Sequence, residues 1–399
     1  EGDVPGVAVY AHASAGCLHV RPLINVKTAR GVELLQAVSD YACGLAVDYG
    51  GAMSGEHGDG LARSELNPRI FGPRLYGALT EVKAAFDPEN LMNPGKIVDA
   101  PPRAANLRFG PDYQTISLPT VFDWGPDGGY APAIEMCNGA GVCRKVGSGT
   151  MCPSFIATRD ERDSTRGRAN ALRNALAGRI PHDELFTPEM KDVMGLCLGC
   201  KACKTECPSA VDMAKIKAEY MVHYHQANGT PLFNRLMGLL PELNEQLYST
   251  GRPFIPAVNA FMRSPVMKQI QARIGVHPER TLPSYASETL AAWFAKEQRK
   301  APASPVGSLQ AGLPPMRLAE GAGHPVILFH DTWVNYNETE VGKAAVRVLQ
   351  AAGYDVYLAQ GRKCCGRPLI TGGQADKAKP WIDHNVALLA PYALQGVPI

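Results

Sequence analysis

The sequence predicts a multidomain α+β chain in which two mixed regions of helix and strand flank a helical, cysteine-rich centre. Three observations support this fold class. Strand and helix patterns alternate over residues 1–100, cysteines concentrate within 134–230, and a strand–helix–strand pattern lies within 323–399. The 399 residues suffice for two to four domains, and 45% of them are hydrophobic, as in folded globular proteins.

Charge, hydropathy and cysteine usage restrict the class of protein. Lys and Arg number 40 against 38 Asp and Glu, so the net charge of +2 does not favour nucleic acid as a partner. The longest apolar runs, such as 325–329, are far shorter than the roughly 20 residues of a membrane-spanning helix. The chain begins without Met or a secretory signal, and its 11 cysteines are clustered, as metal ligands are. We therefore expect a segment of a longer, cytoplasmic protein.

Two stretches rich in proline divide the chain. Prolines recur within 99–133, and 301–323 combines alanine, proline and glycine without a clean period. We expect domains at 1–100, 134–230 and 323–399. Residues 101–133 are then a linker, and 231–322 form a helical connector.

Residues 1–100 predict two strands followed by helices. Apolar residues at 7–10 and 18–20 flank a turn at 14–16, and helical periodicity follows at 32–45 and 75–86. If the strands pair, His12 and His19 face each other across the turn. A glycine-rich loop at 54–60 then presents Glu56 beside His57. Two histidines and a carboxylate are typical of an open metal site, although a histidine by itself is more often structural.

Short sequence patterns also predict helices and strands in the other regions. Thr187 followed by Pro188 predicts the start of a helix, and a helix over 213–228 ends at Asn228-Gly229. Residues 326–329, 339–352 and 355–359 read as strand, helix and strand. Such a βαβ unit implies a parallel pair of strands.

The strongest chemical signal is the motif C-x2-C-x2-C-x3-C-P, formed by Cys197, Cys200, Cys203 and Cys207. This spacing is typical of ferredoxins, in which three thiolates bind one 4Fe–4S cluster and the fourth reaches a second cluster. The proline after the fourth cysteine belongs to this pattern and not to zinc sites. We therefore predict one 4Fe–4S cluster.

An earlier, degraded copy of the motif contains Cys137, Cys143 and Cys152, with Ala140 at the middle ligand position. In the crossed pattern of two-cluster ferredoxins, Cys152 would complete the first cluster, and Cys207 would join Cys137 and Cys143. The second site then has three thiolates. A 3Fe–4S cluster, a 4Fe–4S cluster with a non-cysteine ligand, and no second cluster all stay open.

Residues 5–98 resemble the C-terminal region of FAD-linked oxidases of the vanillyl-alcohol-oxidase superfamily, in particular the D-lactate and D-2-hydroxyglutarate dehydrogenase branch. The resemblance rests on the H-x6-H motif, the loop S-G-E-H-G and the run 91–97. It implies an α/β substrate (cap) domain and a divalent metal, Zn or Mn, bound by His12, His19 and Glu56. His57 would then be the general base.

The same resemblance implies FAD, with Asn93 as a contact. Arg21 and Arg63 flank the motifs, and either could clamp a substrate carboxylate. The loop of the family usually reads H-x-G-D-G-N-L-H, whereas this chain has Ser14, Ala15 and Cys17 at the Gly, Asp and Asn positions. The two histidines of the motif are retained as His12 and His19, whereas its Asp and Asn are replaced by Ala15 and Cys17, so any role of that Asp and Asn does not carry over.

The run K-C-C-G-R-P, which contains Cys364 and Cys365, resembles the CCG domain of the anaerobic glycerol-3-phosphate dehydrogenase, glycolate oxidase and heterodisulfide reductase families. Residues 164–168 match the iron–sulfur subunits of the same enzymes. This resemblance implies a redox role for the two cysteines, in a CCG domain that is incomplete because only one CCG motif is present.

The order of these pieces resembles bacterial fusions of an FAD-linked oxidase with an iron–sulfur oxidoreductase. It implies oxidation of a D-2-hydroxy acid, D-2-hydroxyglutarate being favoured over D-lactate, with electrons passing through the cluster to a quinone or a protein carrier. The alternative is an electron-transfer subunit that turns over no substrate. We also expect a homo-oligomer, and peripheral contact of the apolar and basic stretch 231–320 with the inner face of the membrane stays open.

Overall fold

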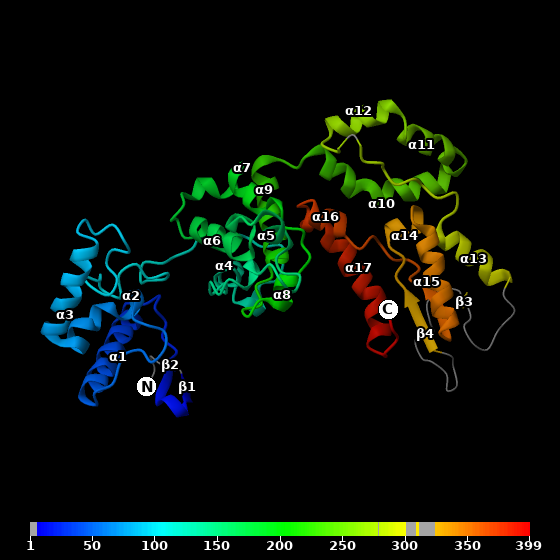
Figure 1. The fold of residues 1–399 in the computed structure, drawn as a ribbon. Helices are drawn as coiled ribbons and strands as arrows, with labels where there is room; N and C mark the ends of the chain where they lie inside the picture. Colours follow the sequence, from blue (N-terminus) through cyan, green and yellow to red (C-terminus); the bar gives the residue numbers. More distant parts are fainter. Residues whose placement is uncertain (1–5, 278, 301–308, 311–323) are drawn as a thin grey trace. The chain divides into compact units, whose positions relative to one another are not determined.

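The computed structural model describes residues 6–277, 279–300, 309–310 and 324–399. The chain divides into two compact units, an N-terminal unit, Glu1–Thr115, and a C-terminal unit, Ile116–Ile399. Helices predominate in both, and each holds one small sheet (Figure 1). This mixture confirms the expected combination of helix and sheet. Among the helices in the described part of the chain, none is both long and apolar enough to cross a membrane.

The N-terminal unit consists of a β-hairpin followed by helices. The elements are β1 (Val7–His12), η1 (Ala13–Ala15), β2 (Cys17–Pro22), α1 (Ala29–Asp48), α2 (Gly60–Arg63), η2 (Ser64–Leu66) and α3 (Asn67–Phe86).

The two strands pair antiparallel, as the sequence predicts. Gly16 closes the turn with a φ of 64°, a left-handed conformation that glycine adopts at little cost. The register pairs His12 with Cys17 and His19 with Tyr10. The two histidines are therefore diagonal neighbours on one face of the hairpin and not direct partners across the turn.

The helices of this unit occur where the periodicity places them, but their apolar faces are only partly covered. Thr28 caps α1, because its hydroxyl accepts a hydrogen bond from the backbone of Gly31 at 3.0 Å. Cys43 is fully buried, whereas Val38 and Leu45 on the predicted apolar face are 39% and 41% exposed. The described helix that packs against α1 is α3, and it covers only part of that face.

The C-terminal unit begins with a helical, cysteine-rich region. Its elements are η3 (Gly125–Asp127), α4 (Tyr130–Glu135), η4 (Val142–Arg144), α5 (Pro153–Thr158), η5 (Glu161–Asp163), α6 (Thr165–Leu176), η6 (His182–Phe186), α7 (Pro188–Gly195), α8 (Ala202–Glu206) and α9 (Met213–Asn228). The predicted helix start at Thr187 and the helix end at Gly229 are both confirmed.

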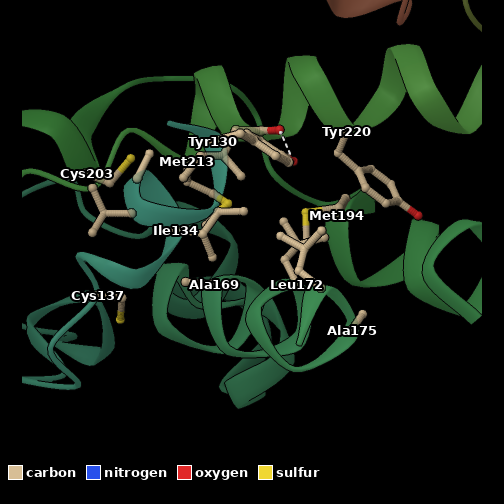
Figure 2. Close-up of a cluster of buried hydrophobic side chains, with 14 of the residues drawn as sticks. Tyr130, Ile134, Cys137, Ala169, Leu172, Ala175, Met194, Cys203, Met213 and Tyr220 are labelled. Atoms are coloured by element: carbon tan, nitrogen blue, oxygen red, sulfur yellow. Dashed lines mark hydrogen bonds between the residues drawn. The ribbon is translucent and has the colours of Figure 1, made fainter. Parts of the chain in front are cut away.

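Four cysteines belong to the buried core of this region, together with aliphatic and aromatic side chains from α4, α6, α7 and α9. Figure 2 shows Ile134, Leu172 and Met194 packed in this core, with Cys137 and Cys203 towards one side of it. The thiols therefore lie at the edge of a closely packed apolar centre. The buried cysteines are Cys137, Cys143, Cys152 and Cys203.

The stretch expected as a linker is divided by the structure. It belongs to the N-terminal unit up to Thr115, whereas Ile116 and Phe122 pack against the helical core and Trp124 is buried within it. Glu219 of α9 fixes this segment. Its carboxylate accepts hydrogen bonds from the backbone of Val121 and Phe122 and from Trp124 Nε1, at 2.9–3.0 Å.

The remaining elements form a helical stretch and a small α/β region. They are α10 (Leu232–Thr250), η7 (Arg252–Phe254), α11 (Ile255–Met262), α12 (Pro265–Arg273), α13 (Leu290–Lys300), β3 (Leu309–Gln310), β4 (His324–Leu328), α14 (Thr332–Tyr336), α15 (Thr339–Ala351), β5 (Tyr354–Leu358), α16 (Arg367–Thr371) and α17 (Ala375–Ala393). Within 231–322, the described residues form helices and the short strand β3. Most of the stretch 301–323 lies outside the described residues.

The predicted βαβ unit is confirmed. Strands β4 and β5 pair in parallel with Val326 opposite Val356, α15 connects them, and the sheet order is β3-β5-β4. The helical stretch contacts this region directly, because Asn234 of α10 donates a hydrogen bond to the carbonyl of Gly372 at 3.0 Å. Gln374 returns one to the Asn234 carbonyl at 2.8 Å.

We predict that replacing Glu219 with Ala destabilises the helical region by about 3 kcal/mol, because one buried donor and two partly buried donors lose their acceptor. Burial alone would raise the pKa of Glu219, but hydrogen bonds from His223, Trp124 and two backbone amides outweigh it and lower the pKa. The carboxylate therefore stabilises the fold above its unfolded pKa, and this stabilisation is lost as the pH falls.

Apparent unfolding midpoints in denaturant at several pH values test this prediction. The unfolding midpoint of the wild type should exceed that of Glu219→Ala at neutral pH, and this difference should disappear as the pH falls from about 6 to about 3. Glu189→Ala, at an exposed position of α7, is the matched control. Equal midpoints for Glu219→Ala and the wild type at neutral pH would show that the carboxylate does not fix this segment.

Candidate functional site

Three imidazoles surround one carboxylate in the N-terminal unit. Oε1 of Glu56 lies 3.5 Å from His12 Nε2, 3.1 Å from His19 Nε2 and 3.0 Å from His57 Nε2. The ligand atoms of His12, His19 and Glu56 lie within 4.8 Å of one another. The structure thus brings together the four residues for which the sequence predicts a metal site and a base.

Glycines allow the hairpin and the loop after α1 to approach closely. A Cβ atom on Gly55 would lie only 2.8 Å from the Sγ atom of Cys17, so a larger residue would push Glu56 away from the histidines. Gly58 has a φ of 70°, which a residue with a side chain adopts only with strain. The S-G-E-H-G spacing therefore has a geometric cause.

The two candidate substrate arginines lie beside this cluster. Arg21 alternates with His19 along β2, so it lies on the same face, and its guanidinium is 5.1 Å from the ring of Tyr10. Tyr10 in turn stacks on His19 with ring centroids 4.4 Å apart. Arg63 donates a hydrogen bond to the carbonyl of Gly58 at 3.1 Å, and this bond holds the loop that carries Glu56.

The run 91–97, which contains Asn93, is attached to the helices that follow the glycine-rich loop. Ser64 Oγ accepts a hydrogen bond from the backbone of Ile97 at 3.1 Å, and Asn67 donates one to the Ile97 carbonyl at 3.0 Å. Asp87 accepts from the backbone amides of residues 91 and 92. A hydrogen bond from Lys83 is the largest effect that lowers the pKa of Asp87. Asn93 itself is exposed, with a φ of 47°.

This donor set fits a divalent cation. Imidazole nitrogens and a carboxylate oxygen bind Zn²⁺ or Mn²⁺, and three protein ligands leave further positions for substrate or water. The side chain of His19 is only 13% exposed, whereas those of Glu56 and His57 are 44% and 65% exposed. One wall of the site is therefore buried and the other is open.

The cysteines of the helical region gather around a hollow. Cys152, Cys197, Cys200 and Cys203 all line it, together with Arg168 and backbone of the Cys197–Cys203 loop. Cys152 comes from the start of α5, more than 40 residues before the others. The structure thus brings together the four thiols that the crossed pattern assigns to one cluster.

Two cations lie beside these thiols. Arg168, which has no exposed surface, reaches Cys152 Sγ at 3.8 Å and the Asp163 carbonyl at 2.6 Å. Lys217 donates to the carbonyl of Cys197 at 2.7 Å. Burial by itself would raise the pKa of Cys152, but hydrogen bonds and Arg168 lower it, whereas burial raises the pKa of Cys203 to about 11. Both cations suit a site that holds several thiolates.

The second cysteine set is less complete. Cys137 and Cys143 are buried close to each other, and the backbone of Arg166 donates to Cys143 Sγ at 3.4 Å. Arg166 also donates to the Gly139 carbonyl at 3.0 Å. Burial raises the pKa of Cys143. Cys207 packs against the same core, and Ala140 supplies no ligand atom.

Cys364 and Cys365 follow β5. Asn385 of α17 fixes their loop, because its side chain donates to the carbonyls of Lys363 and Cys364 and accepts from the Lys363 amide. A hydrogen bond from Cys365, and a further one from Thr332, lower the pKa of Cys364 to about 6 against the effect of burial. The same hydrogen bond raises the pKa of Cys365.

Three residues with evident roles at these sites are not among the predicted ones. Arg168 lies in the matched run 164–168, but only the fold shows that it reaches a cysteine. Lys217 is 20 residues from Cys197, and no spacing rule relates them. Tyr10 could have been inferred, because it alternates with His12 along β1 and so shares its face.

Comparison with known families accounts for most of these features. Residues 5–97 match the C-terminal domain of FAD linked oxidases, 133–211 match the 4Fe-4S dicluster domain, and 327–395 match the cysteine-rich domain CCG. The chain therefore carries these three domains. This result confirms the resemblances inferred from the motifs, and an FAD-linked domain with an iron–sulfur domain agrees with the expected cofactors.

The relatives are longer proteins. The chain is 27% identical to D-2-hydroxyglutarate dehydrogenase of Escherichia coli K12, over 94% of this chain and 38% of the relative. It is 28% identical to that of Pseudomonas putida KT2440, over 98% and 40%. A shorter match, 33% identical over 38% of the chain and 34% of the relative, is to a subunit of the anaerobic glycerol-3-phosphate dehydrogenase of Escherichia coli K12. The chain thus spans about 40% of the first two relatives. No solved structure matches it significantly.

We predict that Glu56→Gln weakens divalent metal binding at least tenfold, because an amide oxygen carries no charge. Metal content after dialysis against graded concentrations of chelator measures this. Glu81→Gln, at an exposed position of α3, should retain the metal of the wild type. Equal metal retention in all three proteins would reject this ligand set.

A second prediction concerns the crossed pattern of the cysteines. Cys152→Ser should abolish the same four-iron signal as Cys200→Ser, because both line one hollow, whereas Cys207→Ser should leave that signal intact. Electron paramagnetic resonance of the reduced proteins, with iron analysis, distinguishes the outcomes. Loss of this signal in Cys207→Ser and its retention in Cys152→Ser would reverse the assignment.

Proposed function

We propose that this chain is part of an FAD-dependent dehydrogenase that oxidises a D-2-hydroxy acid, with D-2-hydroxyglutarate favoured over D-lactate, to the 2-oxo acid. Electrons then pass through one or two iron–sulfur clusters to a quinone or a protein carrier. The convergence of His12, His19 and His57 on the carboxylate of Glu56 carries this proposal.

The residues of the cluster suit an alcohol oxidation. When bound, the metal polarises the substrate hydroxyl and the flavin accepts the hydride from the α-carbon. His12, His19 and Glu56 would hold the metal beside the hairpin. His57, whose Nε2 lies 3.0 Å from Glu56 Oε1, would accept the proton of the substrate hydroxyl.

Two arginines suit a dicarboxylate substrate. Arg21 lies on β2 and contacts Tyr10, and Arg63 lies at the end of α2 and donates a hydrogen bond to Gly58. D-2-hydroxyglutarate has two carboxylates and D-lactate has one, so a pair of guanidinium groups favours the longer acid. The names of the two relatives that match over most of the chain agree with this preference.

The iron–sulfur region supports transfer of the electrons away from the flavin. A flavin that is reoxidised by oxygen needs no cluster, whereas a one-electron relay connects it to a quinone or a carrier protein. The match to a two-cluster domain favours a second cluster at Cys137, Cys143 and Cys207 over its absence. With Ala140 in the middle position, this cluster has three thiolates.

The alternative function is an electron-transfer subunit without turnover of its own. The open side of the histidine cluster, where His57 is 65% exposed, is the observation that favours it. One measurement distinguishes the two functions. Anaerobic addition of D-2-hydroxyglutarate, D-lactate, glycolate and the L-acids to the flavin-loaded protein should bleach the flavin with one D-acid only. If no acid bleaches it, the electron-transfer function is favoured.

We predict that His57→Gln lowers the rate of flavin reduction by about 10²- to 10⁴-fold, because the base is lost while the metal ligands stay. Stopped-flow absorbance measures the rate, and metal analysis verifies that the cation is retained. His324→Gln, which changes an exposed histidine of β4, is the control. An unchanged rate would assign the proton transfer to another group.

A further inference from the structure

A polar cavity of about 310 Å³ in the C-terminal unit lies beside the loop of Cys364, and it is separate from the histidine cluster and from the hollow lined by cysteines. It is lined by residues from four segments. Among them are His330 and Thr332 after β4; Ala359, Gly361, Arg362, Lys363 and Cys364 after β5; Pro241, Glu242 and Glu245 of α10; and Trp381 of α17. Ligands in α/β folds bind beyond the carboxyl ends of parallel strands, and this cavity lies beyond two of them.

The buried polar atoms at this cavity that have no hydrogen-bond partner within the described residues include Nδ1 of His330, whose residue is only 6% exposed, and Nε of Arg362. Burial lowers the pKa of His330 to about 4, so its imidazole is neutral at physiological pH. Buried polar atoms without partners are costly, and a bound molecule that accepts hydrogen bonds removes the cost.

The charges around the cavity limit the kind of molecule. Arg362 and Lys363 contribute positive charge, and Glu242 and Glu245 contribute negative charge, so the lining does not select a net anion. Trp381 and Tyr336 add aromatic surface. A neutral, flat molecule with carbonyl oxygens fits this combination better than a free carboxylate or phosphate.

We propose that this cavity binds the headgroup of a quinone, whose carbonyl oxygens accept hydrogen bonds from His330 and Arg362. The inference rests on the proposed function, which requires an electron acceptor, and it places that acceptor beside Cys364. Two electrons from the hydroxy acid, delivered one at a time through the iron–sulfur path, and two protons from water convert the quinone to the quinol. No bond to the protein forms.

Binding can be measured apart from turnover. The probe is a fully substituted benzoquinone with a short isoprenoid tail, which has no free ring carbon for addition of a thiol. Isothermal titration calorimetry of the oxidised holoenzyme, without hydroxy acid, should show one site per chain. A holoenzyme that binds the quinone but is not reduced by any hydroxy acid would contradict the proposed function and leave this site intact.

Variants locate the site. His330→Phe, which keeps the ring volume, and Arg362→Gln should each weaken quinone binding at least tenfold, because each removes one donor. Trp381→Leu, at a partly exposed position, provides a second type of variant if the buried substitutions impair folding. Arg347→Gln on the exposed side of α15 should bind as the wild type does.

Two results would overturn the proposal. One is an affinity that is the same in the wild type, the three cavity variants and the control. The other is displacement of the quinone by 2-oxoglutarate at concentrations similar to its own, since the cavity would then be a carboxylate site.

Discussion

The buried arginine of α6 is the interaction on which the iron–sulfur region depends. Arg168 has no exposed surface, and a buried guanidinium is tolerated only where negative charge and acceptors surround it. It donates to the carbonyls of Val193 and Asp163 and reaches Cys152, so it ties α7, η5 and the start of α5 together. The carboxylate of Asp163, 3.5 Å away, supplies one countercharge. A thiolate-bound cluster supplies more, which explains why this part of the core is built around thiols.

The sites share a way of construction. In both the histidine cluster and the Cys364 loop, one residue brings separate parts of the chain together. Gly55 lets Glu56 approach the hairpin, and the side chain of Asn385 holds the loop of Cys364 from a helix about 20 residues later. Glu56, His57, Cys364 and Cys365 lie on loops, whereas His12 and His19 lie in the strands of the hairpin.

The sequence predicts those parts of the structure that depend on local spacing. The hairpin, the helix start at Thr187 and the βαβ unit follow from periodicity and caps, and the grouping of Glu56 with the histidines and of Cys197 with other cysteines follows from motifs. Interactions between distant segments leave no such signal. The contact of Glu219 with 121–124, which makes part of the expected linker into core, joins residues almost 100 positions apart. The position of Arg168 against Cys152 likewise depends on how α5 and α6 pack.

The contrast in exposure between the two predicted redox sites has a chemical consequence. Except for the exposed Cys200, the cluster cysteines lie in or against an apolar core, which suits electron transfer because a largely buried cluster changes its solvation little. Transfer of a hydride also requires exclusion of water, yet Glu56 and His57 are 44% and 65% exposed within the described residues. Apolar side chains of the hairpin, Val9 and Val20 among them, are exposed as well. The proposed oxidation would therefore require a surface that covers the histidine cluster.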